Sequence, residues 1–146
     1  MSVNKKIKNA HSKVEDGINF DSKLELQTYK LFKEKGFNLQ RESVTYTLFP
    51  SFYSKTKCYI GSNLDSKKIR AIKYTPDFVM YIPNYTIILE CKGFANDVYP
   101  YKRKLFRYYM DNYSQNNNEF IFFEISNRRD IIFAINKIID LMNYNK

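Results

Sequence analysis

Apolar residues spaced three and four positions apart predict three helices along this chain. The first covers residues 21–35 and can be capped by Asp21 or Ser22. The second follows Asp97 and the third follows Ser126, each of which is expected to cap its helix. The expected buried stripes are Leu24, Thr28, Leu31 and Phe32; then Val98, Tyr101, Leu105 and Tyr108 or Tyr109; and finally Ile131, Ile135, Ile138 or Ile139, and Met142.

Alternating or continuous apolar runs predict four strands, over residues 37–49, 69–81, 86–92 and 120–125. Pro83 and Asn84 supply a turn between the second and third strands. The fourth strand is almost wholly apolar, which is typical of a central strand covered on both faces. Asn116, Asn117 and Asn118 form a turn before it. The order of helix, three strands, helix, strand and helix therefore predicts an α/β fold with a mixed sheet flanked by helices.

The length of 146 residues fits one domain with a substantial core. Residues 1–17 are polar and basic, and we expect them to be a flexible arm that either contacts a DNA backbone or is merely solvated. Residues 18–146 would then form a single domain. Residues 51–68 carry little apolar pattern and are expected to be a loop or an irregular hairpin.

The chain carries 24 Lys and Arg against 15 Asp and Glu, for a net charge of +9. This excess favours a polyanionic partner, most simply nucleic acid, although a generic basic protein has the same balance. No apolar run is long enough to span a membrane and no secretory signal follows the start, so we expect a cytoplasmic protein without a membrane partner.

The scarcity of histidine and cysteine restricts the chemistry that the chain can perform. His11 is the single histidine, which excludes a Ser-His-Asp triad and a histidine-based metal site. Cys58 and Cys91 are too few for a disulfide framework or a zinc site, and Cys91 is expected to pack in the core. Any hydrolysis must therefore use carboxylates, lysine and a metal ion.

Two adjacent strands bring such groups together. Glu90 and Lys92 lie two residues apart and so share one face of their strand. Asp77 begins the preceding strand directly after Pro76, and a hairpin would place its carboxylate beside that of Glu90. Carboxylate oxygens are the ligands that Mg²⁺ prefers, usually one or two of them with water and substrate phosphate. A common alternative is an ordinary Glu–Lys pair on the solvent face of a surface hairpin.

Pro76-Asp77 and Glu90-Cys91-Lys92, separated by twelve residues between Asp and Glu, resemble the signature of the PD-(D/E)xK nuclease superfamily. Residues 22–25 are similar to the helix that supplies an additional catalytic glutamate in phage Holliday-junction resolvases of the endonuclease I type. Residues 97–106 are similar to a segment of other small phage proteins in that superfamily. The resemblance covers about residues 18–125 and implies the restriction-endonuclease-like α-β-β-β-α-β core.

The resemblance also implies roles for individual residues. Asp77 and Glu90 would bind Mg²⁺, for which Mn²⁺ could substitute, and the backbone carbonyl of Cys91 would supply a further oxygen. Lys92 would orient or activate water, and Glu25 would help to hold a second ion or the water. The residues themselves leave an alternative for Glu25, because Ser22-x-x-Glu25 is also a capping box.

Basic residues on two segments are candidates for phosphate contact, although a solvated basic surface remains the alternative for both. Tyr53, Tyr59 and Tyr74 are interleaved with the first group and could stack on bases. The candidates are Lys55, Lys57, Lys67, Lys68, Arg70 and Lys73 in or beside the insertion, and Lys102, Arg103, Lys104 and Arg107 on the second helix.

Together these features predict a Mg²⁺-dependent DNA endonuclease of phage DNA metabolism, located in the host cytoplasm if a phage encodes it. A homodimer acting on branched DNA such as a Holliday junction is expected, because two coordinated cuts need two sites. The alternatives are a restriction-like or nicking nuclease on unbranched DNA, a non-catalytic nucleic-acid-binding module, and a phage inhibitor protein on the same fold.

Overall fold

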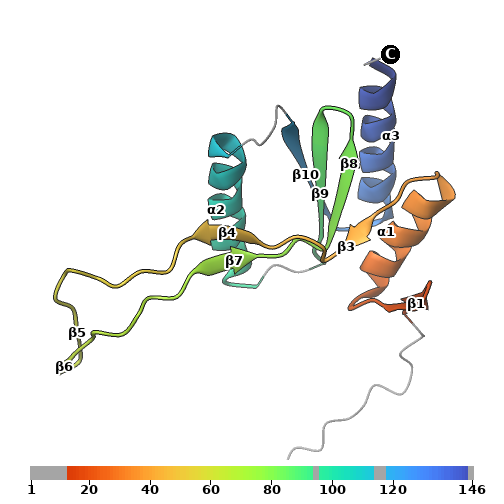
Figure 1. Cartoon of the computed structure of the whole chain (residues 1–146). Helices are drawn as coiled ribbons and strands as arrows, with labels where there is room; N and C mark the ends of the chain where they lie inside the picture. The colour runs from red at the N-terminus through yellow and green to blue at the C-terminus, as the bar shows by residue number, and fades with distance from the viewer. Residues whose placement is uncertain (1–12, 94–95, 114–117, 145–146) are drawn as a thin grey trace, which may run out of the picture.

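The computed structural model describes residues 13–93, 96–113 and 118–144. Its centre is a four-stranded sheet in the order β10-β9-β8-β3 (Figure 1). The strands are β3 (Gln40–Arg41), β8 (Phe78–Ile82), β9 (Tyr85–Cys91) and β10 (Glu119–Ile125). Strands β3, β8 and β9 pair antiparallel, whereas β10 lies parallel to β9. The mixed α/β class predicted from the sequence is therefore confirmed.

Helices cover both faces of this sheet (Figure 1). Helices α1 (Lys23–Glu34) and α3 (Arg128–Tyr144) pack with one face, where Phe32 and Ile131 join Leu89 in the larger core cluster. Helix α2 (Tyr99–Asn112) packs with the other face, where Phe106 joins Ile88 in a second cluster. This separation follows from the strand period of two, which sends neighbouring residues of β9 to opposite faces.

Two of the predicted strands are each divided in two. The predicted strand over residues 37–49 forms β3 and, separately, β4 (Tyr46–Phe49), because Glu42 adopts a positive φ of 46° that breaks the extended backbone. The predicted strand over residues 69–81 forms β7 (Ile72–Tyr74) and β8, with Pro76 between them. Proline cannot donate to a ladder, which explains the interruption.

Strand β9 matches its prediction closely, and the turn at Pro83 and Asn84 is confirmed, with Asn84 at a positive φ of 69°. Strand β10 also forms where it is expected, but its predicted central position is wrong. It lies at the edge of the sheet, and most of its side chains are only half-buried. A continuous apolar run does not distinguish a central strand from an edge strand here, because α2 and α3 pack beside this edge and cover β10. The expected turn at Asn116–Asn118 lies largely outside the described residues.

The three helices are confirmed, but some of their caps and buried faces differ from expectation. Ser22 caps α1 by accepting the Glu25 N–H at 3.1 Å. At α2, Asn96 rather than Asp97 accepts the first free N–H groups, including that of Tyr99 at 2.7 Å. At α3, Asn127 rather than Ser126 has the capping role. The residues that are actually buried are Glu25, Thr28 and Phe32 in α1; Tyr99 and Phe106 in α2; and Ile131, Ala134, Ile135 and Ile138 in α3.

A short hairpin precedes α1 and changes the boundary expected for the basic arm. Strands β1 (Val14–Glu15) and β2 (Ile18–Asn19) pair antiparallel across a turn at Asp16 and Gly17. The Asp16 carboxylate accepts hydrogen bonds from Tyr29 and Lys33 of α1, both at 2.8 Å. Residues 13–17 are thus part of the structured domain, whereas residues 1–12 lie outside the described part of the chain.

The insertion after β4 is an extended pair of strands that projects from the body (Figure 1). We call residues 50–70 the projecting arm. Strands β4 and β7 pair at its base, and β5 (Tyr59–Ile60) and β6 (Asn63–Leu64) pair at its tip. Every residue of the projecting arm is exposed. The expectation of an irregular hairpin here is confirmed.

Candidate active site

The register of the central hairpin places Asp77 opposite Glu90. Val79 pairs with Ile88 and Phe78 pairs with Leu89, so the next step along the ladder brings Asp77 beside Glu90. The Asp77 N–H lies 3.4 Å from Glu90 Oε2, which confirms that the two residues meet. Both side chains lie on the sheet face that α2 covers, as the alternation along β8 and β9 requires.

Hydrogen bonds hold both carboxylates in fixed orientations. The Cys91 N–H donates to Asp77 Oδ2 at 2.7 Å, and the Tyr74 hydroxyl donates to Glu90 Oε2 at 2.6 Å. These bonds engage one oxygen of each carboxylate. The second oxygen of Asp77, Oδ1, accepts no hydrogen bond from any residue that the structure describes. The second oxygen of Glu90, Oε1, has only the Lys92 ammonium nearby among the described residues.

Burial and mutual repulsion disfavour the charged forms of these groups. Desolvation, followed by the charge of Glu90, raises the pKa of Asp77 from 3.8 to about 6. Desolvation also raises the pKa of Glu90, against the lowering effects of Tyr74 and Lys92. Two adjacent carboxylates with raised pKa values, one buried and one half-buried, are typical of a site that a cation completes, because a cation would stabilise both charges.

The Lys92 ammonium is fixed beside this pair from two sides. Its Nζ lies 3.4 Å from Glu90 Oε1 and 4.9 Å from the centre of the Tyr99 ring. Tyr99 is buried and donates its hydroxyl to Glu124 at 2.9 Å. Arg103 also donates to Glu124, at 2.8 Å. Glu124 therefore holds the ring against which Lys92 rests.

Glu25 approaches the same end of the sheet from α1. Its Oε1 accepts the Ser22 hydroxyl at 3.2 Å, while its buried Oε2 has no hydrogen-bond partner among the described residues. Burial, and next the charge of Asp77, raises the pKa of Glu25. The helix-cap interpretation accounts for its N–H, but it does not account for a buried carboxylate oxygen without a hydrogen bond.

Arg41 is the cation nearest to Glu25. Its Nη2 lies 3.7 Å from Glu25 Oε2 and 3.2 Å from Asp21 Oδ2. Its guanidinium also lies 5.6 Å from the centre of the Phe20 ring, and its buried Nε has no hydrogen-bond partner among the residues that the structure describes. Arg41 thus partly offsets the charge of Glu25 without hydrogen-bonding fully to it.

The donor set fits a hard divalent cation held by two carboxylates. Asp77 and Glu90 each offer a second oxygen, and their raised pKa values reflect charge that a cation would stabilise. Mg²⁺ commonly takes one or two carboxylates and completes its shell with water and phosphate. Within residues 13–93, 96–113 and 118–144, no set of three or more His, Cys, Asp or Glu side chains is arranged to hold a metal ion, so Glu25 does not complete a three-carboxylate cluster.

The carboxylates open into a cavity of about 370 Å³. Lys73 from β7 and Lys102 from α2 line it together with Lys92. Three cations around two carboxylates suit a ligand that carries negative charge and binds through a metal ion. Lys73 and Lys102 are therefore the predicted phosphate contacts that the structure brings to the site.

The other predicted phosphate contacts lie in different environments. Arg103 is paired with Glu124, and Lys104 and Arg107 are exposed elsewhere on α2. The projecting arm carries the remaining candidates, Lys55, Lys57, Lys67, Lys68 and Arg70, all exposed. Tyr74 cannot stack on a base as expected, because it is buried and bonded to Glu90.

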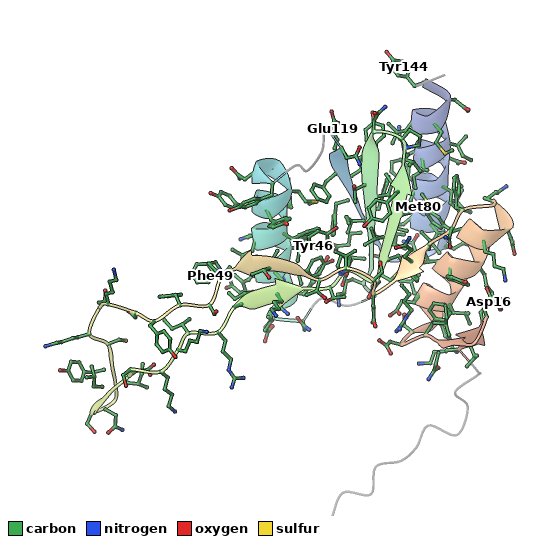
Figure 2. All side chains as sticks on the ribbon, viewed as in Figure 1. Asp16, Tyr46, Phe49, Met80, Glu119 and Tyr144 are labelled. Carbon is green, nitrogen blue, oxygen red and sulfur yellow. The ribbon has the colours of Figure 1, made fainter. Side chains whose placement is uncertain are left out.

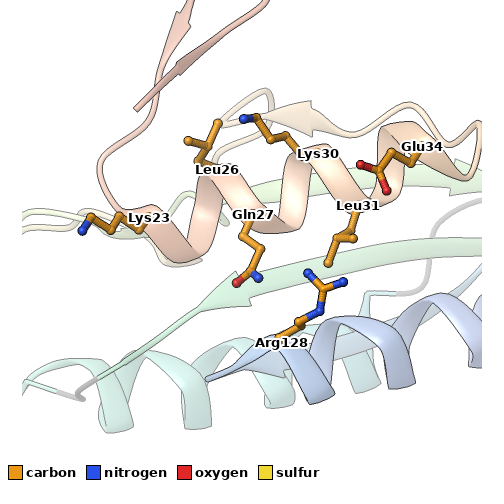
Figure 3. Close-up of a pocket in the computed structure, with 7 residues that line it drawn as sticks. All are labelled: Lys23, Leu26, Gln27, Lys30, Leu31, Glu34 and Arg128. Atoms are coloured by element: carbon orange, nitrogen blue, oxygen red, sulfur yellow. The ribbon is translucent and has the colours of Figure 1, made fainter. Parts of the chain in front are cut away.

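A second hollow, of about 440 Å³, lies away from the carboxylates between α1 and the start of α3 (Figure 3). Leu26 and Leu31 contribute its apolar surface, and Arg128 of α3 points toward the α1 side chains (Figure 3). The polar groups around it belong mainly to exposed lysines and a glutamate of α1. Its lining contains one carboxylate, that of Glu34, and no adjacent pair, so it does not offer the metal-binding chemistry of the first cavity.

Three functional residues are absent from the candidate site residues predicted from the sequence. Tyr74 orients Glu90, Tyr99 lies against Lys92, and Arg41 lies beside Glu25. In the sequence, Tyr74, two residues before Pro76, could have suggested a positioning role. Nothing in the sequence signals Arg41, because its contact with α1 depends on how β3 crosses the sheet.

The fold and the site define a mixed α/β protein with a buried carboxylate, a half-buried carboxylate and a lysine at one end of its central sheet. The chain belongs to the family described as "Protein of unknown function (DUF1064)", which matches residues 5–123. This match includes every residue of the carboxylate cavity. No curated protein and no solved structure is significantly similar to the chain. In the described part of the chain, no helix has the length and apolar character needed to cross a membrane.

Proposed function

We propose that this protein is a Mg²⁺-dependent DNA endonuclease that hydrolyses phosphodiester bonds. The observation that carries the proposal is the meeting of Asp77, Glu90 and Lys92 in one cavity, where Glu90 is buried, Asp77 is half-buried and both pKa values are raised. A structural ion pair would need only one of the two carboxylates. Two adjacent, largely desolvated carboxylates are a cost in stability unless a bound cation stabilises them.

The residues of the site have separate roles in this proposal. Asp77 and Glu90 hold the ion, and Tyr74 and the Cys91 N–H keep their carboxylates aimed at it. Lys92 orients the attacking water or stabilises negative charge on the phosphate. A bound Mg²⁺ would polarise the scissile phosphate and stabilise the leaving oxygen. Because hydrolysis uses water, no side chain needs to become covalently attached.

Glu25 lies on the α1 side of the site, outside the Asp77–Glu90 pair that would hold the ion. Burial and, next, the charge of Asp77 raise its pKa. We propose that its free Oε2 hydrogen-bonds the attacking water or binds a water of the ion's shell. Arg41 Nη2, 3.7 Å from Glu25 Oε2, lowers the pKa of Glu25 and so offsets part of the rise that burial causes.

The order of elements supports a PD-(D/E)xK nuclease core. Helix α1 precedes the antiparallel strands β3, β8 and β9, and α2 then leads to β10, which is parallel to β9. This is the α-β-β-β-α-β order that the sequence resemblance implies. The acidic pair lies at the start of β8 and the end of β9, as that resemblance expects.

DNA is the substrate that the charge distribution favours. The net charge of +9 and the exposed cations of the projecting arm suit a polyanion much larger than a nucleotide. We propose branched DNA and a homodimer, because one carboxylate cluster cuts one strand and a junction requires two cuts. The chain acts in the cytoplasm under this proposal, where such DNA is present.

A cleavage assay with matched substrates tests the function. Wild-type protein and Glu90→Gln are incubated with a four-way junction, a replication fork, linear duplex and single strand, with Mg²⁺ and with EDTA. We expect Mg²⁺-dependent cleavage by the wild type alone, most rapid on the branched substrates. Faster cutting of unbranched duplex than of the junction would favour a restriction-like or nicking nuclease over a junction resolvase. Binding without cleavage under any condition would favour the non-catalytic alternatives and overturn the proposal.

A further inference from the structure

The projecting arm is a structured element that does not belong to the core. None of its residues belongs to either core cluster of the described chain, and all of them are exposed. It is nevertheless ordered by its own contacts. Phe52 and Ile69 exchange both backbone hydrogen bonds, at 3.0 and 2.8 Å, and a turn at Gly61 joins β5 to β6. Its own hydrogen bonds thus join its two sides, and its base continues into the β4–β7 pair.

The side chains of the projecting arm combine positive charge with exposed aromatic and aliphatic surface (Figure 2). Asp65 is its single acidic residue, and that carboxylate accepts the Lys67 N–H at 3.1 Å within the turn. Lys68 lies 5.8 Å from the centre of the Tyr53 ring. The exposed cations are Lys55, Lys57, Lys67, Lys68 and Arg70, and the exposed apolar side chains include Phe52, Tyr53, Tyr59, Ile60, Leu64 and Ile69.

The projecting arm leads directly into the carboxylate cavity. Its returning strand continues from Arg70 into β7, where Lys73 lines the cavity and Tyr74 bonds to Glu90. Asp77 follows four residues after Lys73. A phosphate backbone that occupies the cavity is thus adjacent to the base of the projecting arm, and cations continue from there toward the tip.

The reach of the projecting arm matches about one turn of duplex DNA. Residues 50–60 form its outgoing segment, which at about 3.3 Å per residue for extended backbone reaches at most about 36 Å. One turn of B-form DNA is about 34 to 36 Å long. The excess of positive charge argues against pairing with the projecting arm of a second copy, since like charges along an extended strand pair repel each other. A polyanion complements the same charge.

We propose that the projecting arm lies along duplex DNA to one side of the cavity and extends the binding site by about one helical turn. This inference rests on the proposed function only in taking DNA as the ligand. Lys57, Lys67 and Lys68 contact backbone phosphates, and the exposed aromatic side chains pack on sugars and the groove wall. The cavity is then at one end of an asymmetric footprint, not at its centre.

Charge neutralisation tests the phosphate contacts. The variant Lys57→Gln, Lys67→Gln and Lys68→Gln removes three charges from the projecting arm, and its matched control removes three from α1 and α3 as Lys30→Gln, Lys35→Gln and Lys137→Gln. Binding to a long duplex is measured by fluorescence anisotropy over a range of salt in EDTA. The slope of log K against log salt should become shallower by about two to three in the arm variant, at about 0.9 per lost contact. It should change by less than about one in the control. Equal slopes in the two variants would overturn the proposal.

A shortened variant tests the footprint. Phe52 and Ile69 form a hydrogen-bonded antiparallel pair, so a two-residue Asn-Gly turn can replace residues 53–68 between them. Hydroxyl-radical footprinting should lose protection over about ten base pairs on one side of each protomer's cavity. An unchanged footprint overturns the proposal. A change of particle mass in light scattering together with an unchanged salt slope also overturns it, because the projecting arm would then bind a second copy of the chain and not DNA.

The two proposals can fail separately. All binding measurements are made without metal, so they do not depend on catalysis. A protein that binds through the projecting arm but never cleaves would refute the nuclease proposal alone. If the wild type cleaves DNA but the projecting-arm variants keep its salt slope and footprint, this inference alone would be refuted.

Discussion

Asp77→Asn should stabilise the protein in the absence of divalent metal. The pKa of Asp77 is raised from the ordinary value of 3.8 to about 6, so the folded state holds its proton more tightly than the unfolded state does. The carboxyl then adds stability below about pH 4, and this stability is lost as the pH rises through about 6. The difference corresponds to about 3 kcal/mol at pH 7. Asparagine retains an oxygen for the Cys91 N–H and avoids the charge.

Thermal unfolding measured in EDTA from pH 4 to pH 8 would test this reasoning. For a chain of this size about 3 kcal/mol corresponds to roughly 6 to 12 °C, and partial solvation of the site will reduce the effect. The melting temperature of Asp77→Asn should exceed that of the wild type at pH 8, and the difference should vanish near pH 4. Asp140→Asn, which removes an exposed carboxylate from α3, should change stability by less than about 0.5 kcal/mol.

Metal should offset the difference in stability between the two proteins. A ligand that binds only the folded state stabilises it by about 2.7 kcal/mol at a hundred times its dissociation constant. Mg²⁺ should therefore raise the melting temperature of the wild type and leave that of Asp77→Asn nearly unchanged. If Asp77→Asn is less stable than the wild type in EDTA at pH 8, or if Mg²⁺ stabilises both proteins equally, the charge-repulsion account of the site is wrong.

Three further substitutions test individual contacts in the cleavage assay. Lys92→Ala should lower the cleavage rate by about 10² or more with little change in DNA binding, and a near-normal rate would remove Lys92 from the mechanism. Tyr99→Leu, which removes the ring 4.9 Å from Lys92, should lower kcat by up to about tenfold, whereas Tyr99→Phe keeps the ring and most of the rate. Glu25→Gln keeps a group that can bond to Ser22, so it should lose activity without losing thermal stability; full activity would leave Glu25 as a helix cap only.

The pairing of Asp77 with Glu90 could be predicted from the sequence because it depends only on local rules. The period of two along a strand, a short turn and a proline-defined start are sufficient to bring the two residues together. The start of α1 was predictable for the same reason, since Ser22 and Glu25 are close in the sequence and the capping bond is local. These are the parts of the fold in which few alternatives compete.

The buried face of α2 could not be read from its sequence because tyrosine suits both environments. Tyr101 and Tyr108 are exposed at 68% and 67%, although their spacing resembles a buried stripe. Phe106 decides the orientation of the helix by packing between Tyr74 and Tyr46, with ring centres 4.7 and 5.1 Å away. The position of both partner rings depends on the β4–β7 pair, which a local pattern does not reveal.

The contacts around the carboxylates were hidden for a related reason. Arg41 meets Glu25 only because β3 pairs with β8 and β4 then leaves the sheet after Glu42. Tyr99, at the start of α2, lies against Lys92 at the end of β9, and its hydroxyl donates to Glu124 on the edge strand. Such contacts join residues far apart in the sequence, so they become visible only once the strand order is known.

The central claim is that the Asp77–Glu90 pair serves metal-dependent hydrolysis of DNA. The most direct measurement compares wild-type protein and Glu90→Gln for nicking of supercoiled plasmid and cleavage of a four-way junction, at equal concentration with Mg²⁺ or EDTA. Both proteins should be folded and should bind DNA. The account predicts cleavage by the wild type with Mg²⁺ only and none by Glu90→Gln. Equal, Mg²⁺-dependent cleavage by both proteins would contradict it.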